Sequence, residues 1–343
     1  MSFPALGCPI VLAPMAGGPN TPALAAAVAN AGGLGSFGFA YSTPERIAAD
    51  LAAARALSIG PLNANFFVFR PVVPPAAEQA SRAIAALAAL PGAAGIAFTA
   101  PVPPFVPDLA GQLEPVWRLR PEVLTFHFGL PPAPVIDRAH ALGISVGVTA
   151  TRSSEARAIA AAGADFIVAQ GAEAGGHCGV FVPGEPGDWL PVRELVREIA
   201  RLADLPIIAA GGLMSGADIR EVLAAGAEAA QLGTAFLATT ESGASPAHRR
   251  LLLAERGRDT VLTRAFSGRY ARAIRNTFTD RMSGADVLGF PLQNTLTGPL
   301  RRAAVERDDA EHQSLWAGAH YRHCRTGSAR ELVRRLVAEL GAD

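Results

Sequence analysis

His177 stands in a glycine-rich segment that follows a short apolar run, Gln170-Gly-Ala-Glu-Ala-Gly-Gly-His177-Cys-Gly179. Four glycines within nine residues allow the backbone to approach a flat ligand closely. Histidine changes its protonation state near neutral pH, which suits a catalytic acid or base. A merely solvated loop histidine is the alternative interpretation. The position after a predicted strand favours a functional His177.

Two further glycine-rich turns follow the last two predicted strands. They are Ala209-Ala-Gly211-Gly212-Leu and Gln231-Leu-Gly233-Thr234, and each leads into a predicted helix. Unpaired backbone N–H groups and the positive end of a helix can hold an anion, and the Thr234 hydroxyl adds a donor. Either turn alone could be an ordinary connection. Together, in this order, they predict a phosphate site of the kind that barrels build after strands seven and eight.

A loop of small residues follows the first predicted strand, at Ala13, Pro14 and Met15. We expect it to lie against one edge of a bound planar ring. Amide side chains at strand ends could pair with the N–H and C=O groups of such a ring, although each could equally cap its own loop. These amides are Asn65, Gln170 and Gln231.

The elements that position these residues form an alternating series of strands and helices. The eight strand candidates are 10–13, 34–37, 62–69, 124–128, 144–149, 166–169, 206–210 and 229–232. Helical spacing marks 21–31, 44–57, 154–162 and 215–225. Such alternation implies parallel strands with right-handed crossovers, and eight units closing on themselves give a TIM (β/α)₈ barrel. A doubly wound sheet is the competing fold, but no GxGxxG fingerprint follows the first strand.

Two regions exceed a bare barrel. Residues 70–120 are long for one crossover and rich in proline, so we expect a helix plus an extended loop over the barrel mouth. Residues 241–343 follow the eighth strand and are rich in arginine and in helical patterns. We therefore predict a barrel over residues 1–240, with the long insertion at about 70–120, and an appended C-terminal helical subdomain packed on it.

Composition narrows the class of protein. The chain has 30 basic and 30 acidic residues, and all the basic residues are arginine. A net charge of zero gives no reason to expect nucleic acid as a partner, and no apolar stretch is long enough to predict a membrane span. Three scattered cysteines predict neither a disulfide framework nor a metal site. The first residues do not resemble a signal peptide, so a cytoplasmic enzyme is expected.

At this point the residues carry a resemblance to the nitronate monooxygenase family, formerly called 2-nitropropane dioxygenases. The motifs in the barrel region are APMAGG, Asn65 in NANFF, His127 in TFHFG, QGAEAGGH, AAGGL and QLGTAF. Those beyond it, FSGRYAR, PLQN and SLWAG, resemble the class I branch. The EAGGH element is shared with FMN-dependent enoyl-ACP reductases and quinone reductases, whereas the C-terminal segments favour the monooxygenase branch.

The resemblance implies non-covalently bound FMN, with its phosphate on the loops of Gly212 and Gly233-Thr234. The residues expected beside the flavin ring are Met15, Asn65, Gln170 and Gly175. His177 matches the family's catalytic histidine, either as the base that removes the α-proton of a nitroalkane or as a protonated group that orients a nitronate. His127 matches a second pocket histidine, although a structural hydrogen bond at a strand end would explain it equally well.

The chain also departs from the family pattern. Class I enzymes have a lysine and several tyrosines around the pocket, whereas this chain has no lysine and three tyrosines. Tyr321 is a candidate pocket residue, and Arg322 could supply the missing charge. Metal binding by His320, His323 and Cys324 is conceivable but is not expected. Cys178 is expected to be a packing residue rather than a nucleophile.

The leading functional hypothesis is the oxidation of alkyl nitronates with O₂ to carbonyl compounds and nitrite. Whether nitroalkanes are also substrates stays open. An NAD(P)H-dependent FMN reductase of quinones or enoyl thioesters is the alternative enzyme. A flavin-binding protein without turnover is the non-enzymatic alternative. The expected partners are the small-molecule substrate and O₂, and a homodimer stays open.

Overall fold

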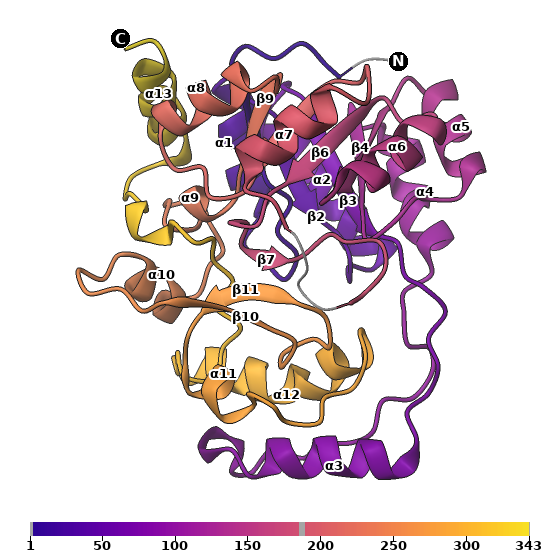
Figure 1. The fold of residues 1–343 in the computed structure, drawn as a ribbon, viewed down its shortest axis with the longest axis vertical. Coiled ribbons are helices and arrows are strands. Elements are labelled where there is room, and N and C mark those ends of the chain that lie inside the picture. The colour runs from indigo at the N-terminus through magenta and orange to yellow at the C-terminus, as the bar shows by residue number, and fades with distance from the viewer. Residues whose placement is uncertain (1–2, 185–188, 343) are drawn as a thin grey trace.

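The core of the protein is a parallel eight-stranded sheet rolled into a nearly closed barrel (Figure 1). The computed structural model describes residues 3–184 and 189–342. The barrel strands are β1 (Ile10–Leu12), β2 (Gly35–Gly38), β3 (Leu62–Phe67), β4 (Val123–His127), β5 (Ser145–Ala150), β6 (Phe166–Gln170), β8 (Ile207–Ala210) and β9 (Ala229–Leu232). Their order is β1-β9-β8-β6-β5-β4-β3-β2. All eight predicted strands are present, and the predicted TIM barrel is confirmed.

Backbone hydrogen bonds join the two ends of the sheet. The amide of Leu12 donates to the carbonyl of Leu34 at 2.9 Å, and the amide of Leu34 donates to that of Ile10 at 3.0 Å. At one end of the barrel, Phe3 and Leu6 pack on a buried cluster that contains Phe166. Because that end is filled by apolar side chains, a site is expected at the other end, where the strands finish.

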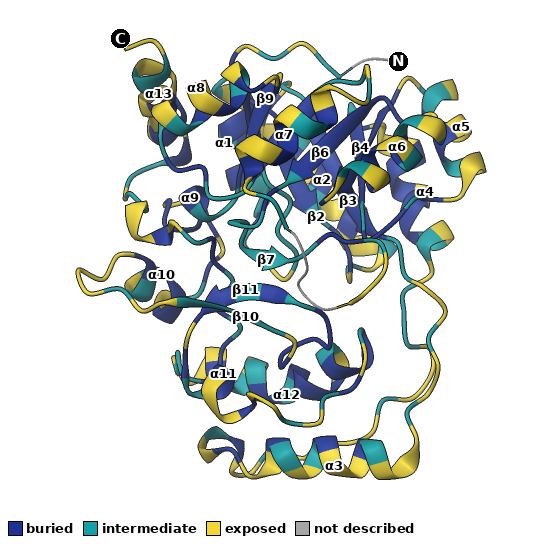
Figure 2. Cartoon of the chain, in the orientation of Figure 1, coloured by how far each residue is buried: buried dark blue, intermediate teal, exposed yellow. Residues whose placement is uncertain are grey.

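The outer helices turn apolar faces to the strands and polar faces outward (Figure 2). They are α1 (Pro22–Asn30), α2 (Pro44–Leu57), α4 (Leu109–Leu119), α5 (Ala133–Ala141), α6 (Ser153–Ala161), α7 (Val192–Ala200), α8 (Gly216–Ala224) and α13 (Ala329–Leu340). No helix in the described part of the chain is long and apolar enough to cross a membrane.

The last helix of the outer layer comes from the end of the chain. Only the four-residue α9 (Thr234–Leu237) directly follows β9. Helix α13, from the C-terminal region, packs against α1 and α8 instead, and its side chains Leu332, Val333 and Leu336 are buried. The C-terminal region therefore completes the barrel in addition to extending it.

The insertion after β3 contains one helix that leaves the barrel. Helix α3 (Ala77–Ala88) and the 3₁₀ turn η1 (Pro91–Ala93) pack beside α12 (Leu292–Glu306), at the bottom of Figure 1. Leu87 and Leu90 share a buried cluster with Phe266 and Leu292. Instead of lying over the barrel mouth, this helix therefore forms part of the core of the C-terminal region. The last helix of the expected insertion, α4, belongs to the barrel layer.

The C-terminal region contains two short strands that were not predicted from its sequence. Besides α10 (Pro246–Leu252), α11 (Thr277–Arg281), α12, η2 (Tyr321–His323) and α13, it holds β10 (Thr260–Thr263) and β11 (Ala271–Ile274). These two strands form an antiparallel sheet with β7 (Gly176–His177), which lies in the loop after β6. The predicted histidine is thus part of the sheet that joins the barrel to the C-terminal region.

We predict that α13 is required for the stability of the barrel. Leu336→Ala removes a fully buried side chain and should lower the free energy of unfolding by roughly 2–5 kcal/mol. Val337→Ala, at a position that is 40% exposed on the same helix, should change it by less than about 1 kcal/mol. Urea unfolding followed by circular dichroism measures both, and equal effects of the two substitutions would contradict the packing of α13.

Candidate active site

The main chain of His177 is held from three sides. His177 lies in β7 and pairs with Ala271 of β11. The next amide, that of Cys178, donates to the carbonyl of Tyr270 at 2.9 Å. The carbonyl of His177 accepts a hydrogen bond from the side-chain amide of Gln170 at 3.0 Å and one from Nε2 of His127 at 3.3 Å. This geometry fixes the histidine at the carboxyl ends of β4 and β6.

Gln170 was predicted to face the flavin ring, and the structure shows that both ends of its amide are used within the protein. While its nitrogen donates to His177, its Oε1 accepts from the backbone amide of Gly179 at 2.7 Å. The amide therefore bridges the two sides of the glycine-rich loop. A contact of Gln170 with a cofactor stays a prediction, whereas its role in shaping the loop is observed.

Aromatic side chains surround the ring of His177. The ring centroids of Trp316, Phe290, Phe128 and Phe67 lie 5.3, 5.7, 5.8 and 6.0 Å from that of the imidazole. They come from the barrel and from the C-terminal region, which therefore builds one wall of the pocket. On its polar side, Nε2 of His177 lies 2.8 Å from the hydroxyl of Ser267.

These surroundings keep both histidines neutral at physiological pH. Burial, together with the charges of His127, Arg269 and Arg301, lowers the pKa of His177 to about 3. Burial and the charge of Arg269 lower the pKa of His127 to about 3 as well, against the opposing effect of its hydrogen bond to His177. A neutral His127 can still donate Nε2–H to the carbonyl of His177, so its observed role is to position the loop.

Two arginines bring positive charge to the surroundings of His177, and neither forms an ion pair with a carboxylate among residues 3–184 and 189–342. The charge of Glu155 still acts on Arg269 from a greater distance. Arg269 is 5% exposed, lies 3.7 Å from the ring centroid of Phe128 and donates to main-chain carbonyls of Cys178 and Val180. Arg301, on α12, donates to Asn294 at 2.7 and 2.9 Å. Burial lowers the pKa of each guanidinium to about 10, so both stay charged at neutral pH. Such a pair favours an anionic ligand.

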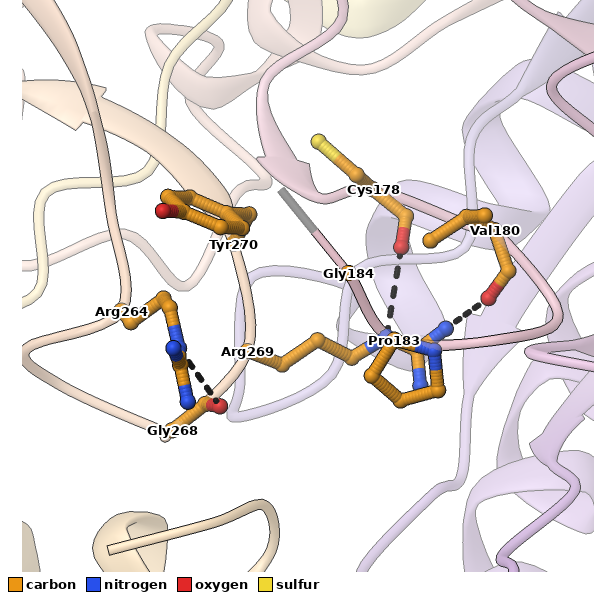
Figure 3. A pocket seen from close by; sticks show the side chains of 8 residues that line it. All are labelled: Cys178, Val180, Pro183, Gly184, Arg264, Gly268, Arg269 and Tyr270. Atoms are coloured by element: carbon orange, nitrogen blue, oxygen red, sulfur yellow. Dashed lines mark hydrogen bonds between the residues drawn. The ribbon is translucent and has the colours of Figure 1, made fainter. Parts of the chain in front are cut away.

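Arg269 also borders a cavity of about 130 Å³ that is lined by residues following His177 and by the segment from Arg264 to Tyr270 (Figure 3). Its wall includes Cys178, Arg264 and Tyr270, and the guanidinium of Arg264 lies 5.8 Å from the centroid of the Tyr270 ring. Burial raises the pKa of the Cys178 thiol to about 12. The cysteine is therefore a neutral thiol at physiological pH, as expected for a packing residue.

The glycines predicted to approach a ligand are closely surrounded by other backbone segments or have positive φ angles. A Cβ on Gly175 would lie 2.4 Å from the amide nitrogen of Gly318, so only glycine fits there. Gly211 and Gly212 have φ angles of +129° and +67°, which glycine adopts without strain. The amide of Gly318 donates to the Thr234 hydroxyl at 3.0 Å, which ties the C-terminal segment to the turn after β9.

Unpaired amides lie in the turns after β8 and β9. Within the described chain, the backbone N–H groups of Gly212, Gly233 and Thr234 have no protein acceptor. The amides of Met214 and Ser215, just before α8, are by contrast already occupied, because they donate to Asp218. A protein carboxylate therefore lies at the start of α8, and an anion held by the turn before this helix stays a prediction.

The amide of Gly216 donates to Glu339 of α13 at 2.9 Å, so a second carboxylate caps the same helix. The loop after β1 is fixed separately. Asn20 accepts from the amide of Met15 at 2.7 Å and donates to the carbonyl of Ala13 at 3.1 Å, so the chain through Pro14 is held in one shape. Ala13, Pro14 and Met15 are each half-buried.

The remaining predicted residues occupy different surroundings. Asn65 is buried and donates to the hydroxyl of Thr125 at 2.9 Å inside the barrel. Gln231 is half-buried in β9. Tyr321 packs with Leu315 and its hydroxyl donates to the carbonyl of Arg258 at 2.6 Å. Its observed contacts do not place Tyr321 beside His177.

The neighbours of Tyr321 lie partly on the surface. Arg322 donates to Gly257 and Asp259, so its charge is used away from His177. The side chain of His320 hydrogen-bonds the carbonyl of Gly212 at 2.9 Å. No group of three or more possible metal ligands is found in the described ranges.

The histidine loop and the glycine turns lie at the carboxyl ends of the strands of a parallel eight-stranded barrel, so the fold belongs to the TIM-barrel class. A sequence profile described as "Nitronate monooxygenase" matches residues 5–339. The chain therefore belongs to the nitronate monooxygenase family, and it is an oxidoreductase.

Named relatives share nearly the whole chain. The nitronate monooxygenase of Paraburkholderia phytofirmans is 42% identical, covering 98% of this chain and 94% of its own. That of Pseudomonas aeruginosa is 40% identical, covering 97% and 96%. The structure is similar to that of nitroalkane oxidase from Streptomyces ansochromogenes, with a TM-score of 0.92, 40% identity and coverage of 98% and 96%. FabK from Thermotoga maritima matches with a TM-score of 0.76 at 27% identity, over 98% of this chain and 93% of FabK.

We predict that the charge of Arg301 depresses the pKa of His177. Arg301→Gln should raise that pKa by roughly half a unit to one unit, because a neighbouring positive charge is lost. Arg302→Gln, one position along the same helix and exposed, should leave it unchanged. Titration of the histidine ring signals by NMR measures both variants. An unchanged pKa in Arg301→Gln would contradict the electrostatic environment described above.

The buried histidines also predict sensitivity to acid. His127, His177 and His248 have pKa values lowered to about 3, 3 and 4, chiefly by burial. Below their usual value of about 6.5, the unfolded chain binds protons that the folded chain does not. Stability should therefore fall as the pH drops from about 6.5 towards 4, by up to about 1.4 kcal/mol per pH unit for each such proton.

Urea unfolding at several pH values measures this slope. His248→Phe removes one of the three groups and should make the slope shallower, whereas His320→Phe, at an exposed position, should not. A stability that is independent of pH over this range would contradict the neutral state of the buried histidines.

Proposed function

We propose that this protein oxidises alkyl nitronates with O₂ through a bound flavin, giving a carbonyl compound and nitrite. The observation that carries the proposal is that a neutral His177, surrounded by aromatic rings, lies near two buried guanidiniums that form no ion pair, those of Arg269 and Arg301. A nitronate is an anion with a small apolar body, which suits positive charge inside aromatic walls. Membership of the nitronate monooxygenase family supports the same substrate class.

The residues fit FMN as the flavin. Unpaired amides at Gly212, Gly233 and Thr234 are the type of donors that hold a phosphate, and Gly211 gives the turn its shape. The residues that we propose to line the ring are Ala13, Pro14, Met15, Asn65, Gln170, Gly175 and Gln231. FMN would supply the electron acceptance and the reaction with O₂.

The protein's own part is to bind the anion, orient it and manage one proton. For a nitronate the proton is already gone, so the guanidiniums bind the substrate and the aromatic rings exclude water. For a neutral nitroalkane, Arg269 and Arg301 would stabilise the anion that forms as His177 takes the α-proton. A histidine with a pKa of about 3 is a weak base, so nitroalkanes should be the slower substrates.

The lowered pKa of His177 supports one of the two roles considered for this residue, that of the base. A protonated imidazole that orients a nitronate would require a pKa near or above the working pH. Burial and the charges of His127, Arg269 and Arg301 all act against that state. We therefore propose that His177 is the base and that the arginines orient the nitro group, with His127 positioning the loop through its hydrogen bond to the His177 carbonyl.

The test is the visible spectrum of the purified protein, followed by anaerobic addition of propane-2-nitronate and, separately, of NADH. We expect the absorption bands of oxidised flavin, and their bleaching by the nitronate but not by NADH. Bleaching by NADH alone would move the chain to the alternative reductase function. A protein that binds FMN but is reduced by neither would support the interpretation without turnover.

A matched pair of variants assigns the turnover to the site. Arg301→Gln should raise the KM for the nitronate at least about tenfold, because one charge-assisted contact with an anion is lost. Arg302→Gln removes the same charge from the same helix but lies outside the proposed pocket. The KM of this variant should therefore equal that of the unmodified protein. Equal KM values for the two variants would exclude Arg301 from substrate binding.

A further inference from the structure

Ser267 has an unusual set of neighbours for a single hydroxyl group. It is fully buried, just before Arg269 in the chain. Its Oγ lies 2.8 Å from Nε2 of His177, 3.1 Å from the carbonyl oxygen of Arg269 and 3.3 Å from the backbone nitrogen of Arg269. The hydroxyl therefore has one imidazole, one acceptor and one donor within hydrogen-bond distance.

Counting protons assigns the direction of each bond. A serine hydroxyl has one proton to donate and two lone pairs that can accept. The carbonyl of Arg269 can only accept, so the hydroxyl proton goes to it. The backbone N–H of Arg269 can only donate, so it takes one lone pair. The remaining lone pair faces His177, which satisfies all three contacts only if Nε2 carries a proton.

The other ring nitrogen of His177 is left open. Nδ1 has no hydrogen-bond partner in the described chain. It is also not one of the fully buried polar atoms without a partner, so it is exposed to some extent. His177 as a whole is half-buried. Nδ1 therefore faces accessible space between the aromatic rings, whereas Nε2 points into the protein.

We propose that Ser267 is a positioning residue that holds His177 as the Nε2–H tautomer, so that Nδ1 is the atom that meets the substrate. Neutral imidazole has its lone pair on one nitrogen only, and the hydrogen bond at the other nitrogen determines which one it is. The same contact fixes the orientation of the ring. Arg269 takes part through its backbone carbonyl and N–H, which form the other two hydrogen bonds of the serine hydroxyl.

The proposal rests on the proposed function for its chemistry. When a nitroalkane is the substrate, its α C–H bond breaks and the proton goes to Nδ1. The electron pair of that bond stays on the substrate as the nitronate. His177 becomes the imidazolium, with Nε2–H still bonded to Ser267. Without the hydroxyl, the ring could present either nitrogen, and only part of the molecules would hold the base towards the substrate.

The direct test is ¹⁵N NMR of the holoprotein labelled at histidine, which needs no turnover. We expect His177, assigned by comparison with His177→Gln, to show a protonated nitrogen at Nε2 and an unprotonated one at Nδ1 near neutral pH. An unprotonated Nε2 would overturn the proposal. Because this measurement involves no substrate, it can succeed or fail independently of the nitronate activity.

Variants then isolate the contribution of the hydroxyl. Ser267→Ala should give mixed tautomer signals for His177 and slow flavin reduction by 2-nitropropane about 10- to 100-fold, as expected when a group that orients a reactive side chain is lost. Ser267→Thr keeps the oxygen and should restore the single tautomer. Ser245→Ala removes a hydroxyl that caps α10 in the same region and should change neither readout. An unchanged tautomer in Ser267→Ala would overturn the role of Ser267.

Discussion

The two hydrogen bonds to the carbonyl of His177 are the interaction on which the rest of the site depends. They come from the ends of two barrel strands, through His127 of β4 and Gln170 of β6. On its other side, the same residue is a strand partner of β11 in the C-terminal region. One backbone unit thus fastens the barrel to the region that supplies Ser267, Arg269 and the aromatic wall of Trp316 and Phe290. Loss of any of these contacts would separate the imidazole from its surroundings.

Those surroundings set the chemistry by desolvation. Apolar rings and neighbouring positive charge make the neutral imidazole the stable form. Buried guanidiniums without carboxylate partners are costly in a folded protein, because the loss of hydration is only partly replaced. At Arg269 the lost hydration is replaced by stacking of the guanidinium on Phe128 and by hydrogen bonds to main-chain carbonyls. Proteins retain such features where function needs them, and an incoming anion would supply the missing charge.

Local sequence patterns were sufficient to predict the barrel and the histidine loop. Eight apolar runs between helices specify parallel strands, and the glycines around His177 specify a loop that a ligand can approach. The glycine turns after β8 and β9 were predicted in the same way, but the carboxylates at the start of α8 were not, because Glu339 reaches it from more than a hundred residues along the chain. Asp218, three residues from its partner, could have been recognised as a capping residue.

Side chains that act through distant contacts could not be predicted. Ser267 and Arg269 lie within a motif that the resemblance had singled out, yet nothing in the spacing shows that they face His177 across 90 or more residues. Arg301 is one of many arginines on helical faces. Tyr321 was a candidate because it follows the SLWAG motif, whereas in the structure its hydroxyl donates a hydrogen bond to a main-chain carbonyl. The short strand β11 carries Arg272 between apolar residues, and its pairing with β7 joins it to a segment far away in the sequence.

The central claim is that the pocket is built for an anion held beside a neutral histidine. The measurement that tests it most directly is the rate constant for anaerobic flavin reduction by propane-2-nitronate and by 2-nitropropane, in the same protein and between pH 6 and pH 9. We expect the nitronate to reduce the flavin at least about tenfold faster at every pH, with a rate constant that does not change as the pH crosses the usual titration range of histidine near 6.5. A neutral nitroalkane that reacts as fast as its nitronate, or a nitronate rate that falls as the pH rises through that range, would show that the site depends on a charged histidine and would contradict the claim.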